Sequence, residues 1–166
     1  MTQIQVHFTE LREGAVLPRY AHLGDAGMDI TACEDVLIHP GETKLVPTGF
    51  AIAIPEGYEA QVRPRSGLSL KTMLRIPNSP GTIDSGYRDE VCIIVHNASF
   101  PQKEESVHLL DTKSNPHGSY LIRKGDRVAQ IVFALTQNAR FEVVPSVKDL
   151  GENREGGFGS TGVSAI

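Results

Sequence analysis

The stretch VAQIVF at residues 128–133 is apolar at every position except Gln130. Short apolar runs rich in β-branched residues are typical of strands that are covered on both faces. A second run, VCIIV at residues 91–95, has the same character. The two runs therefore predict two buried strands, and a subunit interface is one possible source of the second cover.

Elsewhere the apolar residues alternate with polar ones, which indicates half-buried strands. The alternating sets are Ile4, Val6 and Phe8; Val36 and Ile38; Phe50, Ile52 and Ile54; Tyr58, Ala60 and Val62; Phe141 and Val143. Groups of Gly and Pro between these sets read as turns. Only residues 66–73 suit a helix, with Ser66 available as its N-cap. We predict an all-β fold, a jelly roll or distorted β-barrel with one short helix.

The composition predicts one domain without a membrane or nucleic-acid partner. Its 166 residues suit a single core, and no apolar run approaches the roughly 20 residues of a membrane span. The first ten residues lack the pattern of a secretory signal, so we expect a cytoplasmic protein. A formal charge of −4 argues against binding to a nucleic-acid polymer.

Neither the cysteines nor the histidines form a recognised metal-binding motif. Cys33 and Cys92 lie far apart, outside any CxxC spacing, and are expected to be reduced core thiols. The six histidines form no HxH, HxxH or HExxH pair. A catalytic metal held by protein ligands is therefore not expected.

Two segments interrupt the strand pattern. Residues 98–118 are polar and charged around a short apolar centre, which predicts an extended hairpin arm. This arm is either a partner-binding element or a plain surface excursion. Residues 149–166 lack the apolar area to fold alone, so we predict a domain of residues 1–148 and a flexible glycine-rich tail.

Two stretches suit phosphate groups. In GGFGSTG at residues 156–162, which follows Arg154, backbone N–H groups and hydroxyls could bind phosphate oxygens, and Phe158 could stack on a base. The alternative is a disordered Gly-Ser tail. The RPRSG stretch at residues 63–67 offers cations and a hydroxyl before the expected helix, or else an exposed turn with an N-cap serine.

Three polar side chains need an explanation. Asp84 in DSGY either forms a turn or acts as a general base on water. Asp29 interrupts the apolar stretch AGMDI and needs a partner, either an arginine or the waters of a Mg²⁺ ion. Gln130 needs hydrogen bonds, either within the protein or to a ligand.

Five stretches, taken in order, resemble the five motifs of the homotrimeric dUTPase family. They are AGMDI (residues 26–30), RPRSG (63–67), NSPGTIDSGYR (78–88), GDRVAQ (125–130) and GGFGSTG (156–162). The resemblance spans nearly the whole chain. It implies a jelly-roll homotrimer with active sites built from several subunits, which hydrolyses dUTP to dUMP and pyrophosphate with Mg²⁺. That activity limits uracil incorporation into DNA and supplies dUMP for dTMP synthesis.

The resemblance also implies roles for single residues. Asp84 matches the general base, and Tyr87 matches the ring that packs on deoxyribose and excludes a 2′-hydroxyl. Asp29 matches the carboxylate that holds Mg²⁺ through water. The uracil-reading positions are Asn78, Gly81, Thr82 and Ile83, and the phosphate-binding positions are Arg65, Ser66, Gly67 and Gln130. The tail becomes a lid over bound nucleotide. In it, Phe158 matches the aromatic that covers the uracil, Arg154, Ser160 and Thr161 lie near the terminal phosphates, and Gly159 is a further substrate-binding position.

Two positions depart from the family pattern. Arg154 lies one residue closer to Phe158 than the family's tail arginine, and Asp89 stands where a glycine commonly follows Tyr-Arg. Asp tolerates the left-handed conformation that a glycine position often requires.

Two rival functions follow from the same residues. One is a dCTP deaminase-type enzyme, related in fold, although the DSGYR hairpin fits a dUTPase better. The other is a trimeric regulatory protein, of phage origin, which keeps the nucleotide pocket as a switch and uses residues 98–118 for a partner. Asp84 and Tyr87 argue for catalysis.

Overall fold

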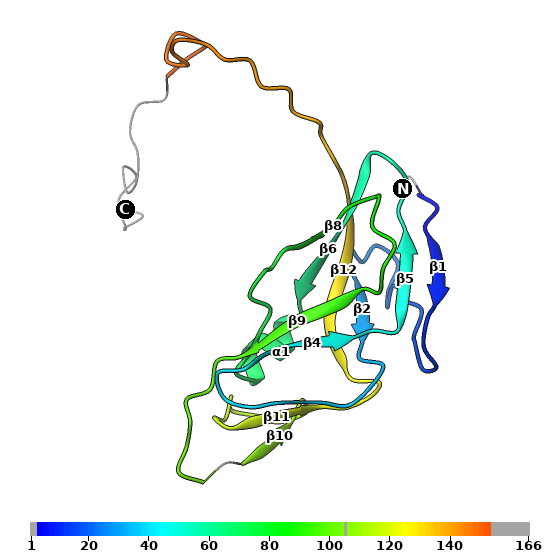
Figure 1. The fold of residues 1–166 in the computed structure, drawn as a ribbon, viewed down its shortest axis with the longest axis vertical. Coiled ribbons are helices and arrows are strands. Elements are labelled where there is room, and N and C mark those ends of the chain that lie inside the picture. Colours follow the sequence, from blue (N-terminus) through cyan, green and yellow to red (C-terminus); the bar gives the residue numbers. More distant parts are fainter. Residues whose placement is uncertain (1–2, 105, 154–166) are drawn as a thin grey trace.

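The computed structural model describes residues 3–104 and 106–153, and its regular secondary structure consists almost entirely of short strands (Figure 1). This part of the chain contains twelve strands and one helix, which is too short to span a membrane. The strands are β1 (His7–Glu10), β2 (Met28–Thr31), β3 (Val36–Ile38), β4 (Thr43–Pro47), β5 (Phe50–Ala53), β6 (Tyr58–Pro64), β7 (Leu74–Arg75), β8 (Gly81–Ile83), β9 (Cys92–Asn97), β10 (Val107–Leu109), β11 (Ser119–Ile122) and β12 (Arg127–Leu135). The helix is α1 (Ser66–Lys71). The predicted all-β class with one short helix is confirmed.

The strands form four small sheets rather than a closed barrel. Their orders are β2-β12-β6-β8, β4-β9-β7, β10-β11-β3 and β1-β5. Side chains from all four sheets meet in a single hydrophobic core, with Ile131 of β12, Ile93 of β9, Ile38 of β3 and Phe50 of β5 among its buried members. The sheets therefore pack around one common core, as in a jelly roll.

The two apolar runs are covered on one face only within this single chain. In β9 the buried Ile93 and Val95 alternate with half-buried Cys92, Ile94 and His96. In β12, Gln130 and residues 132–134 are likewise only half-buried. Burial of both faces, predicted from the apolar runs, is therefore not reached by one chain.

The helix differs from its prediction at both ends. It begins with Ser66 as its first helical residue, Arg65 is the N-cap, and no side chain caps it. It ends at Lys71, where the hydroxyl of Thr72 donates to the Leu68 carbonyl oxygen at 2.7 Å. Leu68 is its one buried residue, so this helix is held by a single apolar anchor.

The alternation at Phe141 and Val143 does not produce a strand. Both side chains are almost fully exposed, at 93% and 98%. Figure 1 shows this segment leaving the body after β12 and running away from it. An alternating pattern needs a neighbouring strand to pair with, and the described part of this chain provides none there.

Residues 98–118 are not the antiparallel hairpin that the sequence predicts. Their one strand, β10, pairs in parallel with β11, which follows the segment and pairs with β3. The buried Asn97 amide nitrogen donates to the carbonyl oxygens of Ile38 at 3.0 Å and Gly118 at 2.8 Å. One side chain therefore fastens both ends of the segment to the body.

Tyr120 fastens the same segment to Met73, just before β7, and provides a test of this packing. Its fully buried hydroxyl accepts a bond from the Met73 N–H at 3.2 Å and donates to the Pro116 carbonyl oxygen. Tyr120→Phe leaves both backbone groups without that partner, which is expected to lower the free energy of unfolding by about 1–3 kcal/mol. Urea denaturation measures it, with Tyr20→Phe at a half-exposed position as the control. Equal stability of the two variants would contradict this assignment.

Candidate active site

Six predicted residues line one cavity of about 220 Å³ beside β8. Such a volume, below the roughly 300–1,000 Å³ typical of drug-sized sites, suits one part of a nucleotide rather than a whole one. The six are Asn78, Gly81, Thr82, Ile83, Asp84 and Tyr87. The cavity also includes Val62, Val91, Cys92 and Ile94, which sequence reasoning missed because a lining position has no signal of its own.

The cavity wall depends on a glycine in β8. Gly81 pairs with Val62 of β6, and a Cβ added at Gly81 would lie 3.0 Å from the Asn78 amide nitrogen. Real Cβ atoms are rarely that close to a neighbour, so any side chain here would displace the Asn78 amide. The glycine therefore allows the amide to rest against the strand backbone.

The turn after β8 presents Asp84 and Tyr87 together. The Tyr87 N–H donates to the Asp84 carbonyl oxygen at 3.0 Å, and the Asp84 side chain is exposed to solvent. The Arg88 guanidinium braces the turn by donating to the carbonyl oxygens of Ser85 at 2.6 Å and Tyr87 at 2.7 Å. An accessible carboxylate beside a cavity is suited to accept a proton from water.

The Tyr87 ring is held at the cavity by its hydroxyl. This hydroxyl donates to the Glu90 carbonyl oxygen at 2.8 Å, and the residue is 39% exposed. Burial, followed by the charges of Asp89, Cys92 and Glu90, raises the pKa of Tyr87 above its ordinary value. The phenol therefore stays protonated and remains a hydrogen-bond donor at neutral pH.

Asp89, which replaces a glycine common in the resembled family, fits the turn without special geometry. Among the described non-glycine residues, only Ser114 and Asn115 have a positive φ. The backbone of Asp89 is therefore not in the left-handed conformation, and replacement of the glycine by Asp does not depend on the ability of Asp to adopt it.

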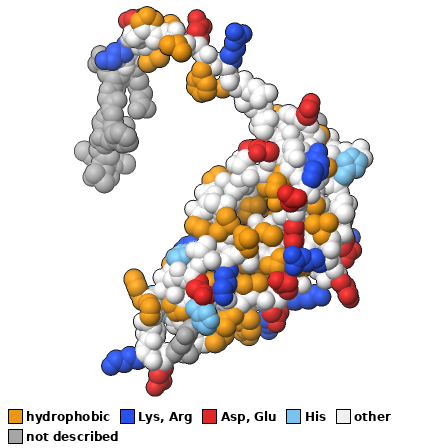
Figure 2. All heavy atoms as spheres, in the orientation of Figure 1, with side chains coloured by type: hydrophobic (Ala, Val, Ile, Leu, Met, Phe, Trp, Pro, Cys, Tyr) orange, Lys and Arg blue, Asp and Glu red, His pale blue; other side chains and the backbone are white. Residues whose placement is uncertain are grey.

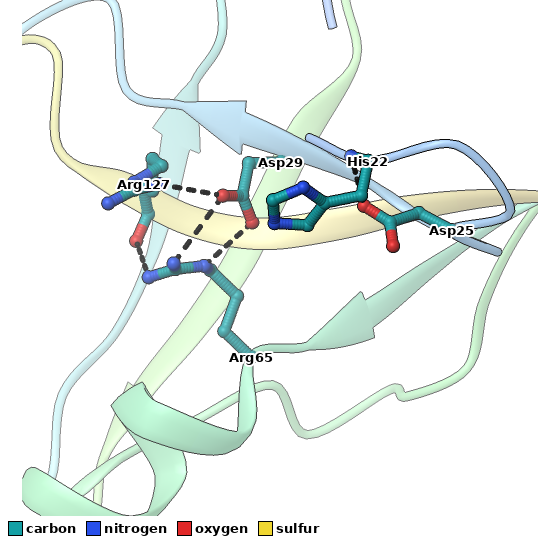
Figure 3. Close-up of polar contacts among 5 residues, drawn as sticks. All are labelled: His22, Asp25, Asp29, Arg65 and Arg127. Atoms are coloured by element: carbon teal, nitrogen blue, oxygen red, sulfur yellow. Dashed lines mark hydrogen bonds and ion pairs between the residues drawn. The ribbon is translucent and has the colours of Figure 1, made fainter. Parts of the chain in front are cut away.

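Two arginines contact Asp29 on β2, and of these Arg65 was predicted as a site residue (Figure 3). The Arg65 Nε lies 2.8 Å from Asp29 Oδ1 and its Nη2 lies 3.4 Å from Oδ2. The Arg127 Nη1 lies 3.2 Å from Oδ2, and Arg65 Nη1 donates to the Arg127 carbonyl oxygen at 3.3 Å. Of the two partners the sequence allows for Asp29, the structure contains the arginine.

The remaining phosphate-type residues adjoin this cluster. Gln130 of β12 lies opposite Asp29 of β2 and opposite Arg63 of β6, so the three share one row of the sheet. Ser66 and Gly67 follow Arg65 directly as the first residues of α1. Sequence reasoning missed Arg127. The signal was present, because Asp29 needs a cationic partner and the GDR stretch at residues 125–127 contains an arginine.

The described residues do not form a metal site held by protein ligands. No group of three or more His, Cys, Asp or Glu side chains gathers within residues 3–104 and 106–153. Both Asp29 oxygens already accept hydrogen bonds from arginines. A role for Asp29 toward Mg²⁺ through water, with few protein ligands, stays a prediction.

Within one chain the cavity and the Asp29 cluster are separate. The cavity lies at the β8 edge of the four-stranded sheet, whereas Asp29 lies on β2 at the other edge, with β12 and β6 between them. In the described part of the chain, no side-chain hydrogen bond or ion pair joins the two groups. The predicted tail residues Arg154, Phe158, Gly159, Ser160 and Thr161 lie outside the described residues.

The fold is an all-β jelly roll, and one of its sheets carries a small cavity with an amide, a carboxylate and an aromatic ring, together with an arginine cluster. These groups suit the base, sugar and phosphates of a nucleotide. The dUTPase family model matches residues 13–103. The deoxyuridine 5′-triphosphate nucleotidohydrolase of Gloeothece citriformis is 40% identical over 98% of this chain and 99% of its own length. The chain belongs to the dUTPase family.

Other similar proteins agree with this assignment. The deoxyuridine 5′-triphosphate nucleotidohydrolase of Solibacter usitatus is 41% identical over 98% of this chain and 99% of its own. The dUTPase of Staphylococcus bacteriophage 80alpha, solved with dUpNHpp, is 33% identical with a TM-score of 0.87, covering 97% of this chain and all of its own. A mutant dUTPase of phage phi11 of S. aureus, described with a structural Mg(II) ion, is 30% identical with a TM-score of 0.78, covering 87% and 99%.

The Asp29 cluster predicts that this carboxylate stabilises the free protein. Asp29→Asn leaves the guanidinium groups of Arg65 and Arg127 close together without a negative charge, which is expected to lower the free energy of unfolding by about 1–2 kcal/mol in EDTA. Urea denaturation measures it. Asp25→Asn is the control, because Asp25 only accepts a local bond from the His22 N–H (Figure 3). An Asp29→Asn protein as stable as the control would contradict the structural role of the pair.

Proposed function

We propose that this protein hydrolyses dUTP to dUMP and pyrophosphate. The observation that carries the proposal is the cavity at β8, where Asn78, Asp84 and Tyr87 meet. Family membership supports the same substrate, since relatives of about 40% identity are named for this reaction. The dUpNHpp-bound phage enzyme, with a TM-score of 0.87, is similar over nearly the whole chain.

The cavity residues would divide recognition and chemistry among them. Asn78 and the β8 backbone at residues 81–83 read the uracil edge, and the Tyr87 ring packs on deoxyribose and leaves no room for a 2′-hydroxyl. Asp84 accepts a proton from water as the water oxygen bonds to the α-phosphorus. The bond from the α-phosphorus to the bridging oxygen breaks, and pyrophosphate leaves.

The cationic elements would hold the triphosphate. Arg65, with Ser66, Gly67 and Gln130 around it, offers charge and hydrogen-bond donors for phosphate oxygens. Mg²⁺ would arrive with the triphosphate as part of the substrate and neutralise its charge, which is consistent with the arginine partners of Asp29. Tail residues 154–161 would close over the bound nucleotide.

We also propose that the active unit is a homotrimer. The cavity and the Asp29 cluster are separate in one chain, so a second copy would complete the site. A groove of about 1,290 Å³ beside β1 and β12 is lined by apolar side chains such as Val6, Phe8, Leu17, Ile52 and Phe133. Phe141 and Val143 are exposed, and Figure 2 shows further hydrophobic side chains open on the visible face of the body. Uncovered apolar area of this size favours association, which light scattering on the purified protein measures.

The cellular role follows from the reaction. Removal of dUTP would limit uracil incorporation into DNA, and the product dUMP would supply dTMP synthesis. We place the enzyme in the cytoplasm, because its substrate is a soluble nucleotide. The segment at residues 98–118 remains a candidate binding site for a protein partner, on the support of its exposed Phe100 and Val107.

The function is tested by substrate choice. Pyrophosphate release is measured in parallel from dUTP, dCTP, dTTP and UTP with Mg²⁺, together with ammonia release from dCTP. Rapid turnover of dUTP alone is expected, because both the uracil and the deoxyribose elements must be satisfied. Ammonia from dCTP would favour the deaminase instead, and no turnover of any substrate would favour the regulatory protein.

The role of Asp84 is tested by its amide. Asp84→Asn keeps the shape of the side chain but removes the proton acceptor, so kcat is expected to fall by about 10²–10⁴-fold. Binding of the non-hydrolysable dUpNHpp, measured by calorimetry, should change little. Asp89→Asn is the matched control, because it removes an exposed carboxylate from the same loop. Near-normal turnover by Asp84→Asn would remove the assignment.

A further inference from the structure

Glu90, at the end of the loop that carries Asp84 and Tyr87, joins three separate parts of the chain. Its side chain is only 16% exposed. Its Oε2 lies 2.8 Å from Arg12 Nη2, and its Oε1 accepts a hydrogen bond from the Gly49 N–H at 2.8 Å. The carboxylate therefore binds the segment after β1 and the turn between β4 and β5 at the same time.

These three residues form a closed set of bonds. The Gly49 carbonyl oxygen accepts hydrogen bonds from the N–H groups of Leu11 at 2.7 Å and Arg12 at 3.1 Å. Gly49 has a φ of +78°, and a Cβ there would lie 3.1 Å from the Cβ atoms of Ala15 and Cys33, so the turn is tight. We call Arg12, Gly49 and Glu90 the Glu90 latch.

The latch fixes the atom to which the Tyr87 hydroxyl is bonded. The Tyr87 hydroxyl donates to the Glu90 carbonyl oxygen at 2.8 Å. The next residue is held on both of its backbone groups, because the Val91 N–H donates to the Phe50 carbonyl oxygen at 2.9 Å and the Thr48 hydroxyl donates to the Val91 carbonyl oxygen. The acceptor of the Tyr87 hydroxyl bond is therefore held in place, and through this bond the position of the Tyr87 ring is fixed as well.

We propose that Glu90 and Arg12 are positioning residues for the Tyr87 ring, and that discrimination between deoxyribose and ribose nucleotides depends on their ion pair. The inference rests on the proposed function, since the ring is assigned to the sugar. Glu90 itself does not line the cavity and acts through the carbonyl oxygen that receives the Tyr87 hydroxyl. Because a 2′-hydroxyl is excluded by contact with the ring, a small movement of the ring would admit it.

The chain supplies a matched control at the other partner of Arg12. The Arg12 Nη1 lies 3.3 Å from Glu34 Oε2, and both of these side chains are about half exposed, at 49% and 53%. Glu34 therefore pairs with the same guanidinium but lies outside the 84–90 loop. Glu90→Gln and Glu34→Gln each remove one carboxylate charge from Arg12, and only the first touches the loop.

The first readout is selectivity. In Glu90→Gln, the ratio of kcat/KM for dUTP to kcat/KM for UTP is expected to fall about fivefold or more. The fall should come mainly from a lower KM for UTP, because the displaced ring admits the 2′-hydroxyl. Glu34→Gln should keep the ratio of the wild type. Tyr87→Phe should lower the ratio in the same way, and the double variant Glu90→Gln/Tyr87→Phe should lose no more than Tyr87→Phe alone.

The second readout needs no activity. Amide hydrogen exchange of residues 84–90 in the nucleotide-free protein is expected to accelerate in Glu90→Gln and to stay unchanged in Glu34→Gln. If Glu90→Gln does not fold, Arg12→Gln at a half-exposed position serves instead, with the same expectations. Circular dichroism and the melting temperature establish folding for every variant.

The outcomes distinguish a failure of this inference from a failure of the proposed function. An unchanged selectivity ratio in Glu90→Gln overturns the inference even where exchange accelerates, since the latch would then be structural only. Equal effects of Glu34→Gln overturn it as well, because the charge of Arg12 rather than the loop would matter. If the wild-type protein does not hydrolyse dUTP, the proposed function is wrong, and so is the claim about selectivity. If amide exchange of residues 84–90 is also unchanged in Glu90→Gln, the Glu90 latch does not hold the loop.

Discussion

The pairing of β12 between β2 and β6 is the constraint on which the candidate site depends. This central strand sets Gln130 opposite Asp29 on one side and Arg63 on the other, and it carries Arg127 to the Asp29 carboxylate. The register with β2 shifts between Arg127, which pairs with Thr31, and Ala129, so the strand is irregular directly after its arginine. Such irregularities often re-aim a side chain. A half-buried carboxylate with two guanidinium groups is the result, and the start of α1 is anchored to it through Arg65.

The second constraint is that one chain leaves much of its apolar surface uncovered. The outer faces of β9 and β12 are half-buried, and the groove beside β1 is lined by apolar side chains. The cavity that holds Asp84 and the carboxylate that binds Arg65 lie at opposite edges of one sheet, beside β8 and on β2. Both facts have one explanation if further copies of the chain cover these faces. Assembly and completion of the site would then be the same event, and burial of apolar area would supply the free energy for it.

Much of the fold could be predicted from the sequence, because period-two alternation and β-branched runs report burial directly. That information is local, however. Phe141 and Val143 alternate like a strand but have no partner strand in the described part of the chain, and the helix lacks the serine cap that its sequence offered. The parallel pairing of β10 with β11 joins residues twelve positions apart, and Asn97 bonds to Ile38 and Gly118 across still more of the chain, so local patterns indicate neither. For the site, the motifs named six of the ten residues that line the cavity, whereas Arg127 and Glu90 emerged only from their contacts in space.

The loop at residues 84–90 shows how this chain obtains a defined site from exposed residues. Asp84 and Tyr87 are both accessible, so packing alone does not fix them. Asp89 supplies none of the freedom of a glycine, and the shape of the turn comes from hydrogen bonds instead. Arg88 braces the turn from within, and Glu90 ties its end to Arg12, a residue far earlier in the sequence. Selectivity at the sugar would therefore depend on a part of the chain that no local motif includes. Arg12, just after the first strand, would contribute to sugar recognition through its partner Glu90. The motif that contains Tyr87 gives no indication of this role, because Arg12 lies far from it in the sequence.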